Sequence, residues 1–73
     1  MTPGTPVRIL IGAGCVRRGT AGTSTRFVGV VEPGQAGLYH GPCPGPLQGE
    51  DWHVIAVGNY DVPLHSSHFE GIA

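Results

Sequence analysis

The sequence predicts a small all-β domain. Thirteen glycines and seven prolines interrupt the 73 residues too often for a long helix. The apolar stretches between them are short and rich in β-branched and aromatic residues, and no apolar stripe with a period of 3.6 residues runs along the chain. These observations favour several short strands joined by turns and loops.

The first two strands are expected over residues 6–11, PVRILI, and 25–32, TRFVGVVE. Both segments combine branched apolar residues with a nearby glycine or proline. Residues 12–24, GAGCVRRGTAGTS, lie between them and are polar and rich in glycine. We therefore expect residues 12–24 to form a long loop outside the core.

A β-hairpin over residues 52–64 is the clearest predicted element. Residues alternate along both of its arms, so that one set faces the core and the other faces outward. Gly58 and Asn59 form a two-residue turn that tolerates positive φ. Pro63 has no backbone N–H, so we expect the return strand to lie at a sheet edge or to end there.

A short turn and a final strand complete the predicted fold. The closing segment HFEGIA returns Phe69 and Ile72 to the core. This order of elements, from VRILI to HFEGI, resembles the SH3-like small barrel. The resemblance implies a five-stranded SH3-like small barrel with two long loops, residues 12–24 and 33–50, and a short 3-10 turn before the last strand. A barrel also removes the exposed edges that five isolated strands would have.

The chain carries few charges for a soluble domain. Residues 1–73 are predicted to form one domain, and 12% of them are charged, against roughly 25% in an average domain. Such a neutral surface favours burial in a homo-oligomer or a larger assembly. A net charge of −1 argues against a protein whose main role is to neutralise phosphates.

The two cysteines, Cys15 and Cys43, are too few for a disulfide scaffold. No basic region followed by an apolar run begins the chain, so no signal peptide is recognised. The apolar runs are also far too short to span a bilayer. We therefore expect a protein with free thiols and no membrane partner, located in the cytoplasm or within a virion or other assembly.

Residues 33–50, PGQAGLYHGPCPGPLQGE, are predicted to be a contact arm. A connection of this length exceeds the roughly 12–15 residues usual in compact domains, and such long loops tend to be functional. The predicted contacts to a protein partner are Leu38, Tyr39, His40 and Leu47. The alternative is a loop folded back on its own barrel. The preferred function is a non-catalytic protein-interaction or assembly module, suited to an accessory subunit of a complex or virion.

A metal-stapled module is a second interpretation. His40 and Cys43 form an H-x2-C pair, and His65 and His68 form an H-x2-H pair. Two such pairs provide the ligand types of a tetrahedral zinc site, which would stabilise a small domain. Prolines on both sides of Cys43 count against this site, and the alternative is a set of unrelated surface histidines. We expect no cofactor.

A nucleic-acid-binding barrel is a third interpretation. The segment VRRGTAGTSTR resembles in outline the glycine-centred loop of KOW-type barrels, which contact RNA and transcription factors. The resemblance implies phosphate contacts from Arg17, Arg18 and Arg26, with Phe27 or Tyr39 as a stacking platform. The alternative is a solvated loop tip held in turns by its glycines.

An enzymatic interpretation comes from a resemblance to the type II dihydrofolate reductases, SH3-like chains that build one active pore from four subunits. Their pore strand Val-Gln-Ile-Tyr and closing Leu-Glu-x-Ile correspond here to Val62–His65 and Phe69–Ile72. Pro63 replaces the glutamine, His65 replaces the tyrosine, and no lysine is present to attract a cofactor phosphate. We therefore expect no reductase activity. We also expect no thiol catalysis, because so small a barrel offers no obvious cleft.

Overall fold

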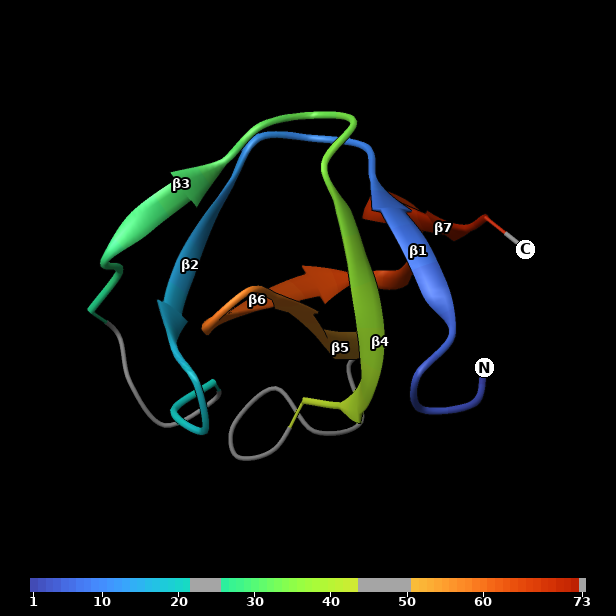
Figure 1. The fold of residues 1–73 in the computed structure, drawn as a ribbon, viewed down its shortest axis with the longest axis horizontal. Coiled ribbons are helices and arrows are strands. Elements are labelled where there is room, and N and C mark those ends of the chain that lie inside the picture. The colour runs from blue at the N-terminus through green and yellow to red at the C-terminus, as the bar shows by residue number, and fades with distance from the viewer. Residues whose placement is uncertain (22–25, 44–50, 73) are drawn as a thin grey trace.

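The computed structural model describes residues 1–21, 26–43 and 51–72. They form an all-β structure, a curled antiparallel sheet (Figure 1). Its seven strands are β1 (Pro6–Ile9), β2 (Ala13–Arg17), β3 (Gly29–Val31), β4 (Ala36–Pro42), β5 (Trp52–Val57), β6 (Tyr60–His65) and β7 (Phe69–Gly71). The prediction of an all-β chain is confirmed, and so is the 3-10 turn before the last strand, η2 (Ser66–His68). Seven strands are present where five were predicted.

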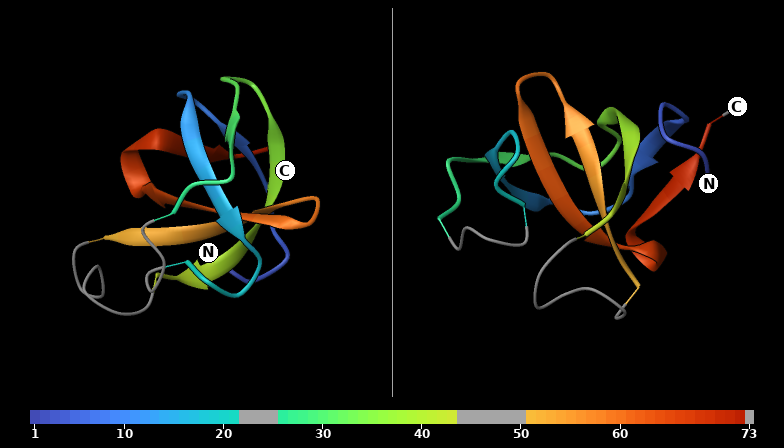
Figure 2. Two further views of the ribbon diagram at one scale, coloured as in Figure 1. Left: turned by 90° about the vertical axis from the view of Figure 1, so that its left-hand side faces the viewer. Right: turned by 90° about the horizontal axis from the view of Figure 1, so that it is seen from below.

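The strands follow the order β3-β2-β6-β5-β4-β1-β7, and all neighbours are antiparallel. The sheet curls strongly. In Figure 1 the β5–β6 hairpin lies behind an arch made by β2 and β3 on one side and by β4 and β1 on the other, and Figure 2 shows the same curl from two further directions. This curl encloses the core and leaves β3 and β7 as the two ends of the sheet.

The β5–β6 hairpin confirms the predicted element and its turn. Val57 pairs with Tyr60 across Gly58-Asn59, and Gly58 has a φ of 58°. The expectation for Pro63 is corrected, because β6 lies inside the sheet between β5 and β2. The β2–β6 ladder pairs only residues 60 and 61 of β6 and stops before Pro63. Pro63 is therefore tolerated because one of its two ladders has already ended.

The prediction that residues 12–24 form a loop outside the core is wrong for their first part. Here β2 pairs with both β3 and β6. Cys15 and Val16 are buried in it, so this segment contributes to the core. Of the predicted strand over residues 25–32, only Gly29–Val31 is a strand.

The prediction of an arm without secondary structure over residues 33–50 is also wrong. β4 occupies Ala36–Pro42 and lies between β5 and β1. A β-bulge between Tyr39 and Gly41 leaves His40 as the extra residue. Residues 44–50, which include the predicted contact Leu47, lie outside the described residues.

The core consists of two groups of buried side chains. The larger lies inside the curl and contains Val7, Ile9, Cys15, Val31, Tyr39, Ile55, Val62, Leu64 and Phe69. The smaller contains Val16, Ala21, Cys43 and Val54, with the half-buried Trp52 packed against it. The described part of the chain has no helix long and apolar enough to cross a bilayer.

Candidate functional site

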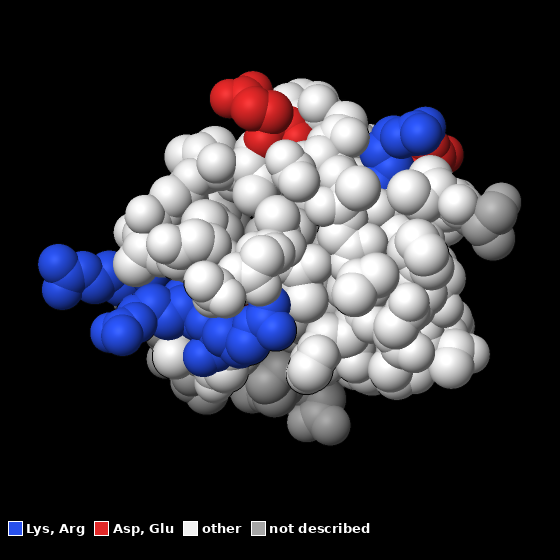
Figure 3. Space-filling model, in the orientation of Figure 1, with Lys and Arg blue, Asp and Glu red and all other residues white. Residues whose placement is uncertain are grey.

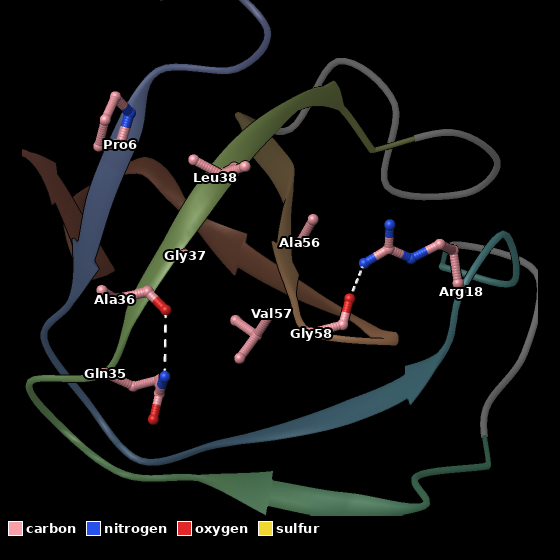
Figure 4. Close-up of a pocket in the computed structure, with 9 residues that line it drawn as sticks. All are labelled: Pro6, Arg18, Gln35, Ala36, Gly37, Leu38, Ala56, Val57 and Gly58. Atoms are coloured by element: carbon pink, nitrogen blue, oxygen red, sulfur yellow. Dashed lines mark hydrogen bonds between the residues drawn. The ribbon is translucent and has the colours of Figure 1, made fainter.

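Two of the hollows on the described surface differ in size and in chemistry. The larger, of about 530 Å³, lies over the outer face of β4 and the β5–β6 turn (Figure 4). We call it the Leu38 groove, and it is lined by Pro6, Arg18, Gln35, Ala36, Gly37, Leu38, Ala56, Val57 and Gly58. Several of its lining residues are small, among them Gly37, Ala56 and Gly58. The Leu38 groove therefore offers few side chains that could contact a ligand.

The two polar side chains of the Leu38 groove are engaged by the protein itself. The Gln35 amide donates a hydrogen bond to the Ala36 carbonyl at 3.1 Å. The Arg18 guanidinium donates to the Gly58 carbonyl and lies 4.0 Å from the carboxylate of Asp61 (Figure 4 shows the first of these contacts). Asp61 is buried and also accepts a hydrogen bond from the Gly19 N–H at 2.9 Å. These bonds hold β2 to β6, and they favour a structural role for this region.

The second hollow has a different chemistry. It has a volume of about 370 Å³ and lies between the β1–β2 connection, the segment before β3, the start of β5, and η2. We call it the aromatic groove, and it is lined by Ile11, Gly12, Ala13, Gly14, Phe27, Trp52, Pro63, Leu64 and His68. None of these lining residues is Asp, Glu, Lys or Arg, so the groove suits a neutral ligand.

Phe27 owes its position in the aromatic groove to Gly14. A Cβ on Gly14 would lie 2.7 Å from Cγ of the Phe27 ring, which is closer than real Cβ atoms approach other groups. Only glycine therefore lets the ring lie directly over β2. Phe27 remains 59% exposed, an unusual exposure for a large aromatic side chain that is not at an interface.

Trp52 forms the other aromatic wall. It begins β5, pairs with His65 across the ladder, and meets the His65 ring edge-on with 5.9 Å between centroids. Its half-buried position leaves part of the indole facing the groove. No described residue accepts a hydrogen bond from the indole N–H. Trp52 thus offers both an apolar face and a polar donor.

Asp51 ties the start of β5 to η2. Its backbone has a φ of 60°, which Asp tolerates better than most residues. Its carboxylate accepts a hydrogen bond from the Ser66 hydroxyl, and its carbonyl accepts one from the Ser66 N–H at 3.1 Å. Because Trp52 follows Asp51 and His68 follows Ser66 by two residues, these bonds fix two walls of the aromatic groove relative to each other.

The same carboxylate continues into a hydrogen-bonded network that runs from the surface toward the core. Asp51 lies 2.9 Å from Nε2 of His53, and Nδ1 of His53 lies 2.8 Å from the Tyr39 hydroxyl. The hydrogen bond from Ser66, followed by that from His53, holds the pKa of Asp51 below its usual value. The network extends from η2 to the centre of β4.

The predicted contact residues do not form one surface. Leu38 is 49% exposed and His40 is exposed, whereas Tyr39 is buried. The prediction that Tyr39 contacts a partner, or stacks on a base, is corrected because its ring packs in the core beside Phe69, with 6.2 Å between centroids. Side chains alternate between the two faces of β4, so neighbouring residues cannot all reach one partner.

The residues of the predicted zinc site are all described, and the structure does not assemble them. Within the described ranges, no three His, Cys, Asp or Glu side chains lie close enough together to hold a metal ion. His65 and His68 are adjacent, with 5.9 Å between ring centroids, and His65 Nδ1 accepts a hydrogen bond from the Ser67 N–H. Cys43 is buried, and burial raises the pKa of its thiol, which disfavours the thiolate that a metal needs.

Arg17, Arg18 and Arg26, the predicted phosphate contacts, are all exposed. Figure 3 shows most of the basic atoms on one side of the molecule, with a smaller group beside acidic atoms elsewhere. Arg17 ends β2, while Arg18 is held by Gly58 and Asp61. Part of this positive charge is therefore balanced within the protein.

Sequence reasoning did not identify the aromatic groove, although single residues carried a signal. The sequence indicates Phe27 only as a stacking platform and Trp52 only as a member of the hairpin. The presence of one tryptophan and two phenylalanines in a chain this small is a usable signal, but the groove depends on long-range pairing. Comparison of the chain with models of known protein families, with curated proteins and with solved structures finds no match.

Proposed function

We propose that this chain is a non-catalytic protein-interaction module with the arrangement of an SH3-like small barrel. The element order supports this proposal. β1, β4, β5, β6 and β7 match the five strands of such a barrel in order, the tight hairpin joins the third and fourth, and η2 precedes the fifth. The second of these strands, β4, lies in the segment expected to be a loop and not over residues 25–32. In this interpretation β2 and β3 are an excursion between the first and second strands.

The proposed ligand is an extended, proline-rich segment of a partner protein, bound in the aromatic groove. The exposed faces of Phe27 and Trp52 carry this proposal. Proline rings pack well on aromatic side chains, and a polyproline II helix is already ordered before it binds. Its backbone carbonyls point outward and accept hydrogen bonds, so the Trp52 indole N–H supplies the matching donor.

The rest of the groove fits the same ligand. No described lining residue is Asp, Glu, Lys or Arg, and a neutral segment leaves no buried charge unpaired. Gly12 and Gly14 have no side chains, so a bound backbone can approach β2 closely. The contacts between Asp51 and Ser66 hold Trp52 and η2 in place before binding, which lowers the entropic cost of association.

Trp52 is the only tryptophan, so its fluorescence reports directly on the groove. The probe is decaproline with both ends blocked, and a blocked glycine-serine peptide of equal length serves as the control ligand. We expect decaproline to shift the Trp52 emission in a saturable way and the glycine-serine peptide to leave it unchanged. The same titration followed by NMR should move the indole N–H signal to a position typical of a hydrogen-bonded donor.

Two variants locate the binding site. Phe27→Ser should weaken binding roughly tenfold or more, because an aromatic anchor is lost. Tyr60→Ser removes a similarly exposed aromatic ring outside the groove and should leave the affinity unchanged. Gly14→Ala should weaken binding while the protein stays folded, because the added methyl group displaces the flexible Phe27 ring.

Two outcomes contradict the proposal. Saturable binding that Phe27→Ser and Tyr60→Ser affect equally would remove the groove from the binding site. No response to decaproline, together with salt-sensitive binding of a single-stranded oligonucleotide that depends on Arg17, would favour the nucleic-acid interpretation instead.

A further inference from the structure

Two histidines lie at the end of the aromatic groove that η2 forms. His68 lines the groove and is half-buried there. His65, the last residue of β6, lies beside it with 5.9 Å between the two ring centroids, and its ring also meets that of Trp52. Imidazole is the side-chain group that ordinarily gains or loses a proton between about pH 5 and pH 8. The charge at this end of the groove therefore depends on pH.

His65 holds η2 through a ring nitrogen that carries no proton. Its Nδ1 accepts a hydrogen bond from the Ser67 N–H at 3.3 Å, which caps the start of the turn, and lies 2.9 Å from the Ser67 hydroxyl. A protonated ring nitrogen is a donor and has no lone pair with which to accept. A proton on Nδ1 of His65 therefore removes the acceptor of the Ser67 N–H and weakens the attachment of the turn that carries His68.

The described residues around His68 offer no opposite charge. The β1–β2 connection, the segment before β3, the start of β5 and the end of β6 all line the same groove, and none of the lining residues is Asp, Glu, Lys or Arg. The carboxylate of Asp51 interacts electrostatically with His53 and His65. Glu70, on β7, is paired with Arg8. A proton taken up by His68 therefore places a positive charge on a surface that is otherwise neutral.

We propose that the aromatic groove changes from neutral to positively charged through His65 and His68 as the pH falls from about 8 to about 5, and that it releases its ligand in acid. This inference rests on the proposed function for the identity of the ligand. A proline-rich segment has no side-chain charge to pair with an imidazolium, and covering that charge with apolar atoms removes its water. The loss of the cap on η2 acts in the same direction, since η2 forms one wall of the groove.

Titration of the protein with decaproline at several pH values between about 5 and 8, followed by Trp52 fluorescence, measures the effect. We expect the dissociation constant to rise roughly tenfold or more toward acid, because only the fraction of molecules with neutral histidines binds well. A dissociation constant that is unchanged or lower in acid would overturn the proposal.

Two substitutions remove the titration and keep a neutral polar side chain. His65→Asn retains a side-chain oxygen of the kind that caps helical turns, and His68→Gln retains an amide at the groove. Each should reduce the pH dependence, and the double variant should bind decaproline equally well throughout the range. His40→Gln is the matched control, because His40 is exposed on β4 and does not line the groove, and it should keep the full dependence. Full pH dependence in the double variant would contradict the assignment to these two residues.

A measurement without peptide separates this inference from the proposed function. Iodide, an anion, and acrylamide, a neutral molecule, both quench tryptophan fluorescence. The ratio of iodide to acrylamide quenching of Trp52 should rise as the pH falls, and it should stay constant in the double variant. If this ratio rises although decaproline does not bind even at about pH 8, the proposed ligand is wrong and the change of charge is supported. If decaproline binds and the ratio stays constant, the change of charge is wrong and the proposed ligand is supported.

Discussion

The two ends of the sheet are built in opposite ways. At one end, β7 pairs with β1, and Arg8 and Glu70 lie opposite each other with 3.6 Å between their charged groups. At the other end, β3 presents the apolar side chains of Val28 and Val30. In a chain with only nine Arg, Asp and Glu residues, an opposite-charged pair stands at one edge and no charge stands between residues 27 and 31 at the other.

This difference between the two ends of the sheet predicts different effects of substitution at each end. Natural proteins often place charged residues on edge strands to prevent association, and residues 27–31 at the β3 end carry none. The β1–β7 end also carries fully buried core residues such as Ile9. We therefore expect truncation of the buried Ile9 to change folding stability much more than truncation of the exposed Val30.

The largest expected effect comes from Ile9→Ala. Ile9 is fully buried in β1, and its truncation should lower the free energy of unfolding by about 2–5 kcal/mol. Val30→Ala, at the β3 end, should change it by less than about 0.5 kcal/mol when measured on the monomer. Urea unfolding followed by Trp52 fluorescence measures both. Similar losses of unfolding free energy in Ile9→Ala and Val30→Ala would contradict this difference between the two ends.

A second prediction concerns removal of the charged pair at the β7 edge. Replacing Arg8 and Glu70 together by threonine should cost less than about 1 kcal/mol of folding stability, because the pair is exposed. It should, however, create a second neutral edge, and light scattering should then show species larger than those of the unchanged protein.

The matched control for this exchange is the reversed pair, Arg8→Glu with Glu70→Arg. It keeps both charges on the β7 edge, so its mass should equal that of the unchanged protein. If the threonine variant also keeps that mass, the charged pair does not protect the edge.

The smallest expected effect concerns Asp51, which joins β5 to η2 between the two ends. Hydrogen bonds from Ser66 and His53 lower the pKa of Asp51 in the folded protein. The ionised Asp51 carboxylate therefore stabilises the fold at pH values above the pKa that Asp51 has in the unfolded chain. This contribution is lost as the pH falls through the lower pKa that Asp51 has in the folded protein. Urea unfolding between about pH 2 and pH 7 should show a shallower acid dependence for Asp51→Asn.

Asparagine is the informative replacement because it also tolerates the positive φ of Asp51. Equal acid dependence in Asp51→Asn and the unchanged protein would contradict this role. Ser66→Ala should give a partial effect of the same sign, since it removes the first of the two hydrogen bonds.

The sequence predicted the elements whose signals are local. The hairpin over residues 52–64 alternates along both arms and turns at Gly58-Asn59, and it is present in the structure. β2 and β4 were missed because glycine and small residues interrupt their apolar patterns. In β4 only Tyr39 and Gly41 are buried, and the strand is formed by pairing with β5 and β1 on its two sides.

The candidate site was predicted less well than the fold because it is assembled from distant segments. Phe27 and Trp52 become walls of one groove only after β2 has paired with β6. The predicted contacts in β4 failed for a related reason, since strand geometry sends Tyr39 inward and Leu38 outward. A pattern in one segment cannot indicate which partner strand will cover which face.

The pairing of β1 with β7 has a consequence for synthesis on the ribosome. The hairpin of β5 and β6 is local and can form within microseconds of its completion. β1 is made first, yet one of its two neighbours is the last strand to be made, with Val7 opposite Gly71. At about 5–20 residues per second, β1 waits several seconds for that neighbour. Until Phe69–Gly71 has been made, one side of β1 has no partner strand, so the sheet closes only once β7 is available.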